Sequence, residues 1–196
     1  MDVQFFPEGG DMVAGLENKI AFKAINEFGK PADVEGIVMN SNGVIMSEFQ
    51  SYHQGMGAFD FKPLEGEKYT AKITKPSNIK GEFPLPISLE RGNLMHVVKV
   101  DDEKMQVRVQ SAENQSFTLV LQSQGNVVYS TATTAEAGEH LIQIPTKKFP
   151  IGIAQLTMFD ESERPHAERL VFLNKNKTLD ISIRTDKEQY LSLIHI

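Results

Sequence analysis

Alternation of apolar and polar residues is the dominant pattern along the chain. In "MQVRVQ", Met105, Val107 and Val109 alternate with polar residues, and "NKIAFKA", "FTLVLQS" and "LDISIRT" follow the same period of two. This period places the apolar side chains on one face of a strand and the polar ones on the other. No stretch long enough for a helix combines helical apolar spacing with helix-forming composition. The pattern therefore predicts an all-β chain of half-buried antiparallel strands.

Turn residues separate these predicted strands at short intervals. Six such turns occur: Asn26–Pro31, Asn42-Gly43, Gly55–Gly57, Glu65–Glu67, Gly125-Asn126 and Asp160–Pro165. Glycine, proline and asparagine favour the backbone angles that tight turns need. Many short strands joined by tight turns are typical of β-sandwiches.

The pattern breaks once, at "ITKPSNIKGEFPLP", which holds three prolines and one glycine. Proline disfavours pairing in a central strand, so this stretch is typical of a linker or a strand that crosses between domains. We therefore expect a first β-sandwich over residues 1–80 and a second over residues 81–174.

The C-terminal residues are expected to lie outside both sandwiches. Residues 175–190 contain "LDISIRT", which predicts the opening strand of a truncated third domain, because one strand cannot bury its apolar face alone. Residues 191–196, "LSLIHI", break the polar alternation that precedes them. They are the translation of a DNA sequence, CTG TCT CTT ATA CAC ATC, that resembles a transposon end used to build sequencing libraries. We interpret them as a non-native, adapter-derived tail; an apolar strand tail is the alternative.

Composition excludes several classes of function. The chain has 196 residues and a formal net charge of −6, which argues against binding to nucleic acid or an anionic membrane. It has no cysteine, so disulfides, thiol nucleophiles and cysteine-ligated metals are excluded. No apolar run approaches the roughly 20 residues that span a bilayer, so direct membrane insertion is not expected.

A glycine-rich stretch near the N-terminus, "FFPEGGDMVAGLE", places Gly10 and Gly15 at the spacing of a phosphate-binding loop. Such a loop continues with lysine and a hydroxyl residue at the start of a helix. Here Leu16 and Glu17 follow, and a strand pattern comes next. We interpret the stretch as an acidic turn between two strands.

Two acidic clusters and five histidines are the remaining candidates for chemistry. The runs 101–103 and 160–163 could bind calcium, but contiguous acids beside strands are more typical of solvated turns. The histidines lack the local spacing of a zinc site, and no G-x-S-x-G motif occurs. We therefore predict no catalytic, cofactor-binding or metal-binding residue, and no enzyme activity.

One short segment differs from the predicted strand cores. In "SYHQGMG", Tyr52 and His53 stand at a glycine-flanked strand end, where loops commonly carry binding residues. We take these two residues as a candidate contact surface.

The chain resembles the macroglobulin-like domains of large bacterial cell-envelope proteins. The resemblance rests on the opening "FFPEGG", the turns "FGKP" and "NSNG", the ending "GMGAFDFKPLEGEKYTAKI", and "FPIGIAQLTMFDESERPHAERLVFLN" in the second half. It covers nearly the whole chain and is weaker over residues 92–143. Among such proteins, the sequence is most similar to those linked to TonB-dependent outer-membrane receptors. The thioester of protease-trapping relatives needs a cysteine, which is absent.

The resemblance implies two tandem immunoglobulin-like antiparallel β-sandwiches plus the first strand of a third. It implies a non-catalytic structural and interaction fragment of an exported protein in the periplasm or at the cell surface. Its partners would be neighbouring domains of the parent and outer-membrane or periplasmic proteins, with no cofactor. Two alternatives stay open: a ligand- or carbohydrate-binding accessory module of a surface enzyme, and an enzyme whose site is assembled from strand ends.

Overall fold

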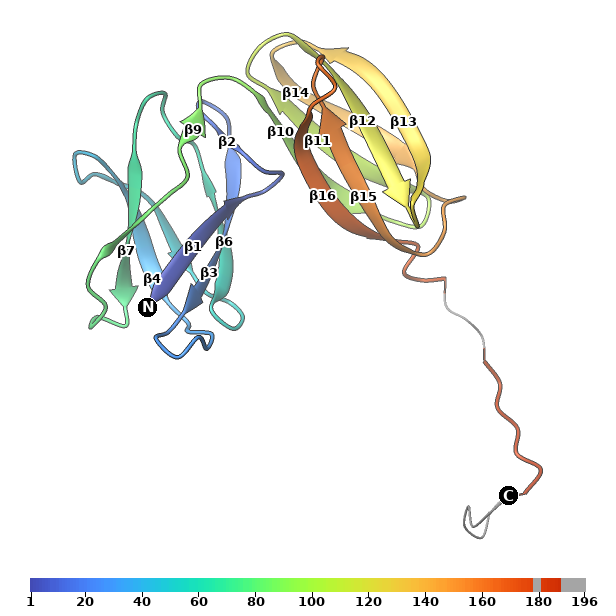
Figure 1. Cartoon of the computed structure of the whole chain (residues 1–196), viewed down its shortest axis with the longest axis horizontal. Helices are drawn as coiled ribbons and strands as arrows, with labels where there is room; N and C mark the ends of the chain where they lie inside the picture. Colours follow the sequence, from blue (N-terminus) through green and yellow to red (C-terminus); the bar gives the residue numbers. More distant parts are fainter. Residues whose placement is uncertain (178–180, 188–196) are drawn as a thin grey trace.

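The computed structural model describes residues 1–177 and 181–187. This part of the chain contains sixteen β-strands and no helix. The strands form two β-sandwiches that follow one another along the chain (Figure 1). The prediction of an all-β fold built from antiparallel sandwiches is confirmed.

The first sandwich has a three-stranded and a four-stranded sheet. The first sheet has the order β1 (Asp2–Pro7), β3 (Asn18–Ile25), β6 (Met56–Phe61), and the second has the order β5 (Ile45–Gln50), β4 (Glu35–Asn40), β7 (Tyr69–Lys75), β8 (Glu82–Pro84). All neighbouring strands are antiparallel.

Aromatic side chains fill the core of the first sandwich. Residues of β3 alternate between buried and exposed along the strand, which places Phe22 in this core. The ring of Phe49 lies edge-on to that of Phe5 at 5.8 Å and stacks on that of Phe59 at 5.5 Å. Such arrangements add to the free energy gained by burying the rings. The rings of Phe5, Phe22, Phe49 and Phe59 are therefore packed in the core.

Tyr69 ties the loop before β7 to this core. Its ring packs edge-on against Phe61 at 4.7 Å, and its hydroxyl oxygen accepts a hydrogen bond from the backbone N–H of Leu64 at 2.8 Å. Tyr69→Phe keeps the ring and leaves this partly buried N–H without a partner. We expect a loss of about 1–2 kcal/mol in the free energy of unfolding, measured by urea denaturation. Tyr52→Phe, at an exposed ring, is the control, and equal effects of the two substitutions would contradict the assignment.

The second sandwich repeats the arrangement with different core chemistry. One sheet has the order β10 (Asn93–Val100), β11 (Lys104–Ser111), β14 (Gly138–Pro145), and the other has the order β13 (Asn126–Ala135), β12 (Gln115–Ser123), β15 (Gly152–Phe159), β16 (Pro165–Leu173). Its largest fully buried side chains come from leucine, methionine and isoleucine: Met95, Met105, Leu119, Leu121, Ile144, Leu156, Met158 and Leu173.

The first sandwich extends beyond the predicted boundary at residue 80. Strand β8 pairs with β7, and Leu85 is buried in the first core. Strand β9 (Ser88–Leu89) then pairs in parallel with β2 (Met12–Val13). Residues 82–89, expected in the second domain, therefore belong to the first. The predicted boundary was wrong because the prolines were taken as evidence against a strand. Strand β8 lies at the edge of its sheet, where proline is tolerated.

The predicted strand of a third domain is not formed in the part of the chain that is described. Residues 175–177 and 181–187 contain no strand, and Ile181 and Ile183 are exposed. A strand needs a neighbour for its backbone hydrogen bonds, and no described strand pairs with these residues. The rest of the predicted strand and the predicted adapter-derived tail, residues 191–196, lie outside the described residues.

Candidate functional site

The predicted contact residues lie in the hairpin that joins β5 to β6. Backbone hydrogen bonds from Tyr52 N–H to Met56 O and from Met56 N–H to His53 O, both 2.9 Å, close the hairpin. Gln54 and Gly55 have positive φ angles, as tight hairpin turns require. The side chain of Tyr52 is 69% exposed, and His53 is also exposed. The structure therefore presents both residues to solvent.

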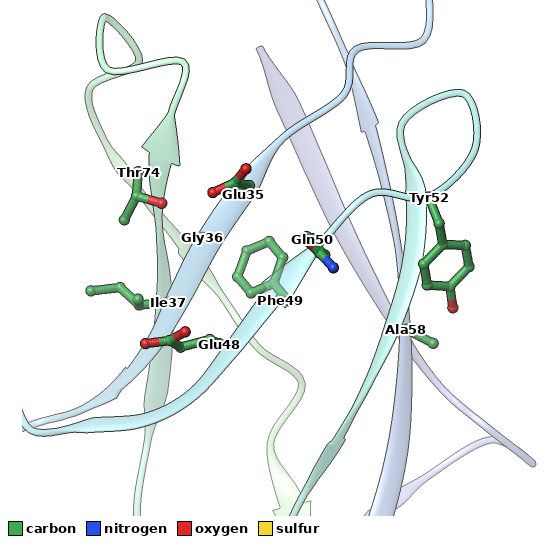
Figure 2. A pocket seen from close by; sticks show the side chains of 9 residues that line it. All are labelled: Glu35, Gly36, Ile37, Glu48, Phe49, Gln50, Tyr52, Ala58 and Thr74. Atoms are coloured by element: carbon green, nitrogen blue, oxygen red, sulfur yellow. The ribbon is translucent and has the colours of Figure 1, made fainter.

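A groove of about 540 Å³ runs beside this hairpin. Its polar lining comes from β4, β5 and β7 and includes Glu35, Glu48 and Gln50, whereas Tyr52 stands at the other end, beyond Phe49 (Figure 2). Glu35 is ion-paired with Lys75 at 2.8 Å. His53 is not among the lining residues. Of the two predicted contact residues, Tyr52 thus lines the groove and His53 does not.

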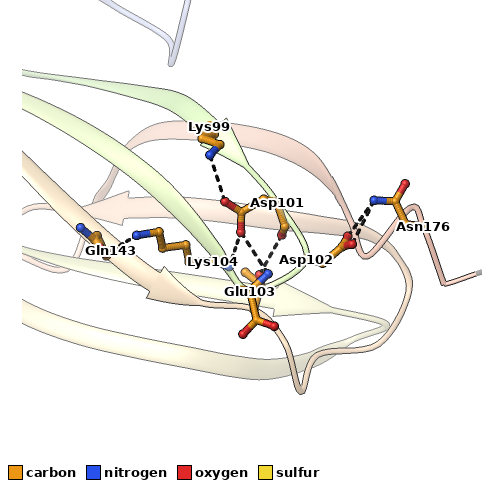
Figure 3. Close-up of polar contacts among 8 residues, drawn as sticks. Lys99, Asp101, Asp102, Glu103, Lys104, Gln143 and Asn176 are labelled. Atoms are coloured by element: carbon orange, nitrogen blue, oxygen red, sulfur yellow. Dashed lines mark hydrogen bonds and ion pairs between the residues drawn. The ribbon is translucent and has the colours of Figure 1, made fainter.

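The acidic run 101–103 is a hydrogen-bonded turn (Figure 3). One carboxylate oxygen of Asp101 accepts the backbone N–H groups of Glu103 at 3.0 Å and Lys104 at 2.9 Å, and these bonds lower the pKa of Asp101. The carboxylate of Asp102 accepts hydrogen bonds from the amide of Asn176 at 3.0 Å. The turn interpretation is confirmed, because the Asp101 carboxylate stabilises the local chain geometry.

The second acidic run has the same structure. Asp160 accepts the backbone N–H groups of Ser162 at 2.8 Å and Arg164 at 2.9 Å, which lowers its pKa. Within the described residues, no three histidine or acidic side chains gather as they would around a metal ion.

The "PEGGD" turn proves to be the point where the two sandwiches meet. The carbonyl oxygen of Gly9 accepts a hydrogen bond from the backbone N–H of Glu168 on β16 at 2.9 Å. Glu8 points at the same sandwich: its carboxylate lies 3.7 Å from Nδ1 of His96 on β10 and 3.5 Å from Nε of Arg169 on β16. The turn prediction is confirmed, and this turn also forms a contact between domains.

Glu8 is held as a carboxylate in a largely buried position. Its side chain is only 13% exposed. The close contact with His96 lowers the pKa of Glu8, and the positive charges of Arg169 and Lys19 act in the same direction against the effect of burial. A buried carboxylate needs such partners, because leaving it unpaired carries a large desolvation cost. We call Glu8, His96 and Arg169 the interdomain ion cluster.

An apolar seam lies beside the interdomain ion cluster. Leu94 and His96 are on the face of β10 opposite to Met95, which belongs to the second core, yet they are only 2% and 5% exposed. Leu94, Val13 and Ala14 are buried but belong to neither core cluster. The first domain therefore covers the outer face of β10.

Sequence reasoning missed this interface, although one signal was present. Leu94 and Met95 are consecutive apolar residues, and all four residues of "NLMH" are buried, unlike the strictly alternating residues of the neighbouring strand β11. A strand that is buried on both faces loses its alternation. Next to the interface, charged side chains line a crevice of about 370 Å³: Glu8, Glu17, Lys19, Asp60, Arg108 and Arg169.

Comparison with known proteins gives distant matches among solved structures. No protein-family model and no curated protein matches the chain. One similar solved structure is the BSP domain of a biofilm associated protein, with 14% identity over 89% of this chain and 30% of that one and a TM-score of 0.37. The bacterial integrin-binding protein invasin matches with 12% identity over 89% of this chain and 39% of that one, at a TM-score of 0.34. Trypsin-activated alpha-2-macroglobulin from Escherichia coli matches with 11% identity over 87% of this chain and 15% of that one, at a TM-score of 0.31. The chain spans less than half of each. Because the TM-scores lie below 0.5, these matches assign neither a family nor an activity.

The described residues contain no helix with the length and apolar character of a membrane span.

Proposed function

We propose that the chain is a non-catalytic scaffold and interaction module of a larger exported bacterial envelope protein. The observation that carries the proposal is the interface at the "PEGGD" turn, which joins the two sandwiches through backbone, ionic and apolar contacts. The macroglobulin-like motifs in the sequence support a place in the periplasm or at the cell surface. They also support the finer proposal of a parent protein linked to a TonB-dependent outer-membrane receptor, with neighbouring domains and envelope proteins as partners.

The scaffold function depends on a fixed angle between the sandwiches. Tandem domains joined only by a linker reorient freely, whereas a buried interface restricts them. Here the connection between β9 and β10 is short, and the interface adds the Gly9–Glu168 hydrogen bond and the interdomain ion cluster. The two domains are therefore expected to tumble as one rigid unit.

Gly9 lies very close to the second domain. It has a φ angle of +92°, and an added Cβ atom would lie 3.3 Å from the carbonyl oxygen of Met95 and 3.5 Å from Cβ of Ala167. Gly9→Val would therefore press the two sandwiches apart. Gly15→Val is a matched control, because Gly15 also has a positive φ of +75° but no atom within 4 Å of its added Cβ.

Residual dipolar couplings test the proposal. In the wild type and in Gly15→Val, couplings from both sandwiches should fit one alignment tensor with the domains placed as in the structure. In Gly9→Val we expect two tensors, or one at a changed angle, with the backbone chemical shifts of each core retained. Two independent tensors in the wild type would overturn the scaffold proposal, since the domains would then reorient freely.

A further inference from the structure

The outer face of the sheet β1-β3-β6 carries a row of apolar side chains that runs across its three strands. Phe6 on β1 lies opposite Ala21 on β3, and Ala21 lies opposite Ala58 on β6. Phe6 and Ala21 are exposed and Ala58 is half-buried, so this row faces away from the core. Neighbouring strands lie about 4.8 Å apart, which separates the Cα atoms of Phe6 and Ala58 by about 10 Å. The row is therefore a floor of two methyl groups with an aromatic ring at one end.

Tyr52 stands at the Ala58 end of this row. Figure 2 shows the ring of Tyr52 and the methyl group of Ala58 on the same side of β6, turned away from Phe49. The side chains of Phe6 and Tyr52 are 49% and 69% exposed, and both line one hollow of about 530 Å³. Small-molecule sites have volumes of about 300–1,000 Å³ and combine aromatic walls with a few polar groups. We call this hollow the Phe6–Tyr52 slot.

Polar side chains flank the slot on both sides. The two neighbouring rows of the same sheet face are mostly polar: Gln4, Lys23 and Met56 in one, and Lys19 and Asp60 in the other. Two carboxylates and two cations line the slot itself: Glu8, Glu168, Lys19 and Arg169. Because these charges balance, the slot favours a neutral ligand over an anionic one.

We propose that the Phe6–Tyr52 slot binds a neutral sugar ring of a carbohydrate chain. A sugar ring presents C–H groups on its faces and hydroxyl groups around its edge. Its face would lie on the methyl floor and against the two aromatic rings, where apolar contact is favourable. Its hydroxyl groups both donate and accept hydrogen bonds, so they can pair with the ammonium group of Lys19 and with the carboxylate of Glu168.

A wholly apolar occupant fits the slot less well. The apolar row is one residue wide, so an aromatic or aliphatic side chain of a peptide would remove the flanking charged groups from water without pairing them. Arg169 contacts Glu8 at 3.5 Å, whereas Lys19 forms no ion pair with a described residue. The slot therefore favours a ligand with an apolar face and a polar edge.

Titration with neutral tetrasaccharides tests the proposal. Amide chemical shifts of the isotope-labelled protein are followed while cellotetraose, xylotetraose, mannotetraose or chitotetraose is added. We expect at least one of them to shift the signals of Phe6, Ala21 and Tyr52 to saturation. The proposal is overturned if none of the four shifts these signals at concentrations up to about 10 mM. Saturable shifts confined to another surface would also overturn it.

Substitution of the aromatic walls tests the site itself. Phe6→Ala should raise the dissociation constant of the bound tetrasaccharide about tenfold or more, because it removes one wall of the slot. Phe28→Ala is the matched control, since Phe28 is a 77% exposed phenylalanine of the same domain that does not line the slot. Tyr52→Ala removes the other wall from an exposed hairpin, so it gives a result even where Phe6→Ala unfolds. Affinities equal to that of Phe28→Ala in both variants would contradict the assignment.

Two further ligands separate a sugar from other flat groups. N-acetylphenylalaninamide offers an aromatic ring without a polar edge, and adenosine offers a flat base with a polar edge. Binding of either one as tightly as the best tetrasaccharide would overturn the proposal in favour of a peptide or a nucleoside. The outcome is independent of the scaffold proposal, because Phe6, Ala21, Ala58 and Tyr52 all belong to the first domain. Sugar binding can therefore fail while the dipolar couplings still fit one tensor.

Discussion

Gly55→Ala is expected to destabilise the first domain by about 3 kcal/mol or more, the cost of a left-handed backbone angle together with a buried steric clash. Gly55 has a φ of +71°, and an added Cβ atom would lie 2.3 Å from the carbonyl oxygen of Ala24 and 2.9 Å from the backbone nitrogen of Ala32. These are backbone atoms, so no side-chain rotation can relieve the contact.

Hydrogen bonds of the Gly55 backbone oppose a shift that would relieve this clash. The carbonyl oxygen of Gly55 accepts the N–H of Ala24 at 2.8 Å, and its own N–H donates to the carboxylate of Asp33 at 2.8 Å. Moving the hairpin away from β3 would break the bond with Ala24, and moving it away from the segment before β4 would break the bond with Asp33. The substitution therefore lowers the free energy of unfolding in either case, through the steric clash or through the broken hydrogen bonds.

Gly66→Ala is a control that measures the cost of the left-handed backbone angle without a steric clash. Gly66 has the same φ of +71°, but nothing lies within 4 Å of its added Cβ. We expect this control to cost only about 1–2 kcal/mol. Urea denaturation of both variants gives the comparison, and similar losses at the two positions would show that the Gly55 hairpin can shift without cost. The expected difference implies that Tyr52 and His53 are presented from a firmly anchored hairpin.

Glu8→Gln is expected to lower the free energy of unfolding by about 2 kcal/mol at pH 7, because it replaces the charged partner of His96 and Arg169 with a neutral one. The size of the effect should depend on pH. The pKa of Glu8 is lowered from its ordinary value of 4.5 in the folded protein. The stability from its carboxylate is therefore present above about pH 4.5 and is lost as the pH falls through the lower, folded-state pKa.

The difference between wild type and variant is the quantity to measure. Asp101 and Asp160 also have lowered pKa values, so the wild type loses stability in acid for several reasons. Urea denaturation at several pH values between about 7 and 3 should show the wild type and Glu8→Gln converging as the pH falls. The exposed Glu17→Gln is the control. A gap between wild type and Glu8→Gln that stays constant down to the lowest pH would contradict the role given to the charge of Glu8.

The sequence pattern predicted the strands well because each sandwich buries one face of most strands. The alternation around Met105, Val107 and Val109 corresponds directly to the buried positions of β11. The same local rules failed at β8, because nothing in "EFP" reveals that the strand lies at an edge. Whether a strand is central or at an edge depends on its neighbours in space, which the local sequence does not specify.

The interface between the domains was harder to predict for a related reason. Glu8, His96 and Arg169 come from three distant parts of the sequence, and each alone resembles an ordinary surface residue. Their proximity depends on how the two sandwiches meet. By contrast, the acidic runs at 101–103 and 160–163 were interpreted correctly as turns, because the hydrogen bonds that Asp101 and Asp160 accept from the backbone join residues within one turn.

The Gly9–Glu168 hydrogen bond also sets an order of events during synthesis. It joins the first turn of the chain to the last strand of the second sandwich, so the two domains cannot lock together until β16 has left the ribosome. Contacts between residues so far apart in the sequence are slow to form, whereas each sandwich closes through shorter loops. Until Arg169 has been synthesised, the chain therefore carries Glu8 without its full set of partners, on a first domain whose strands are already complete.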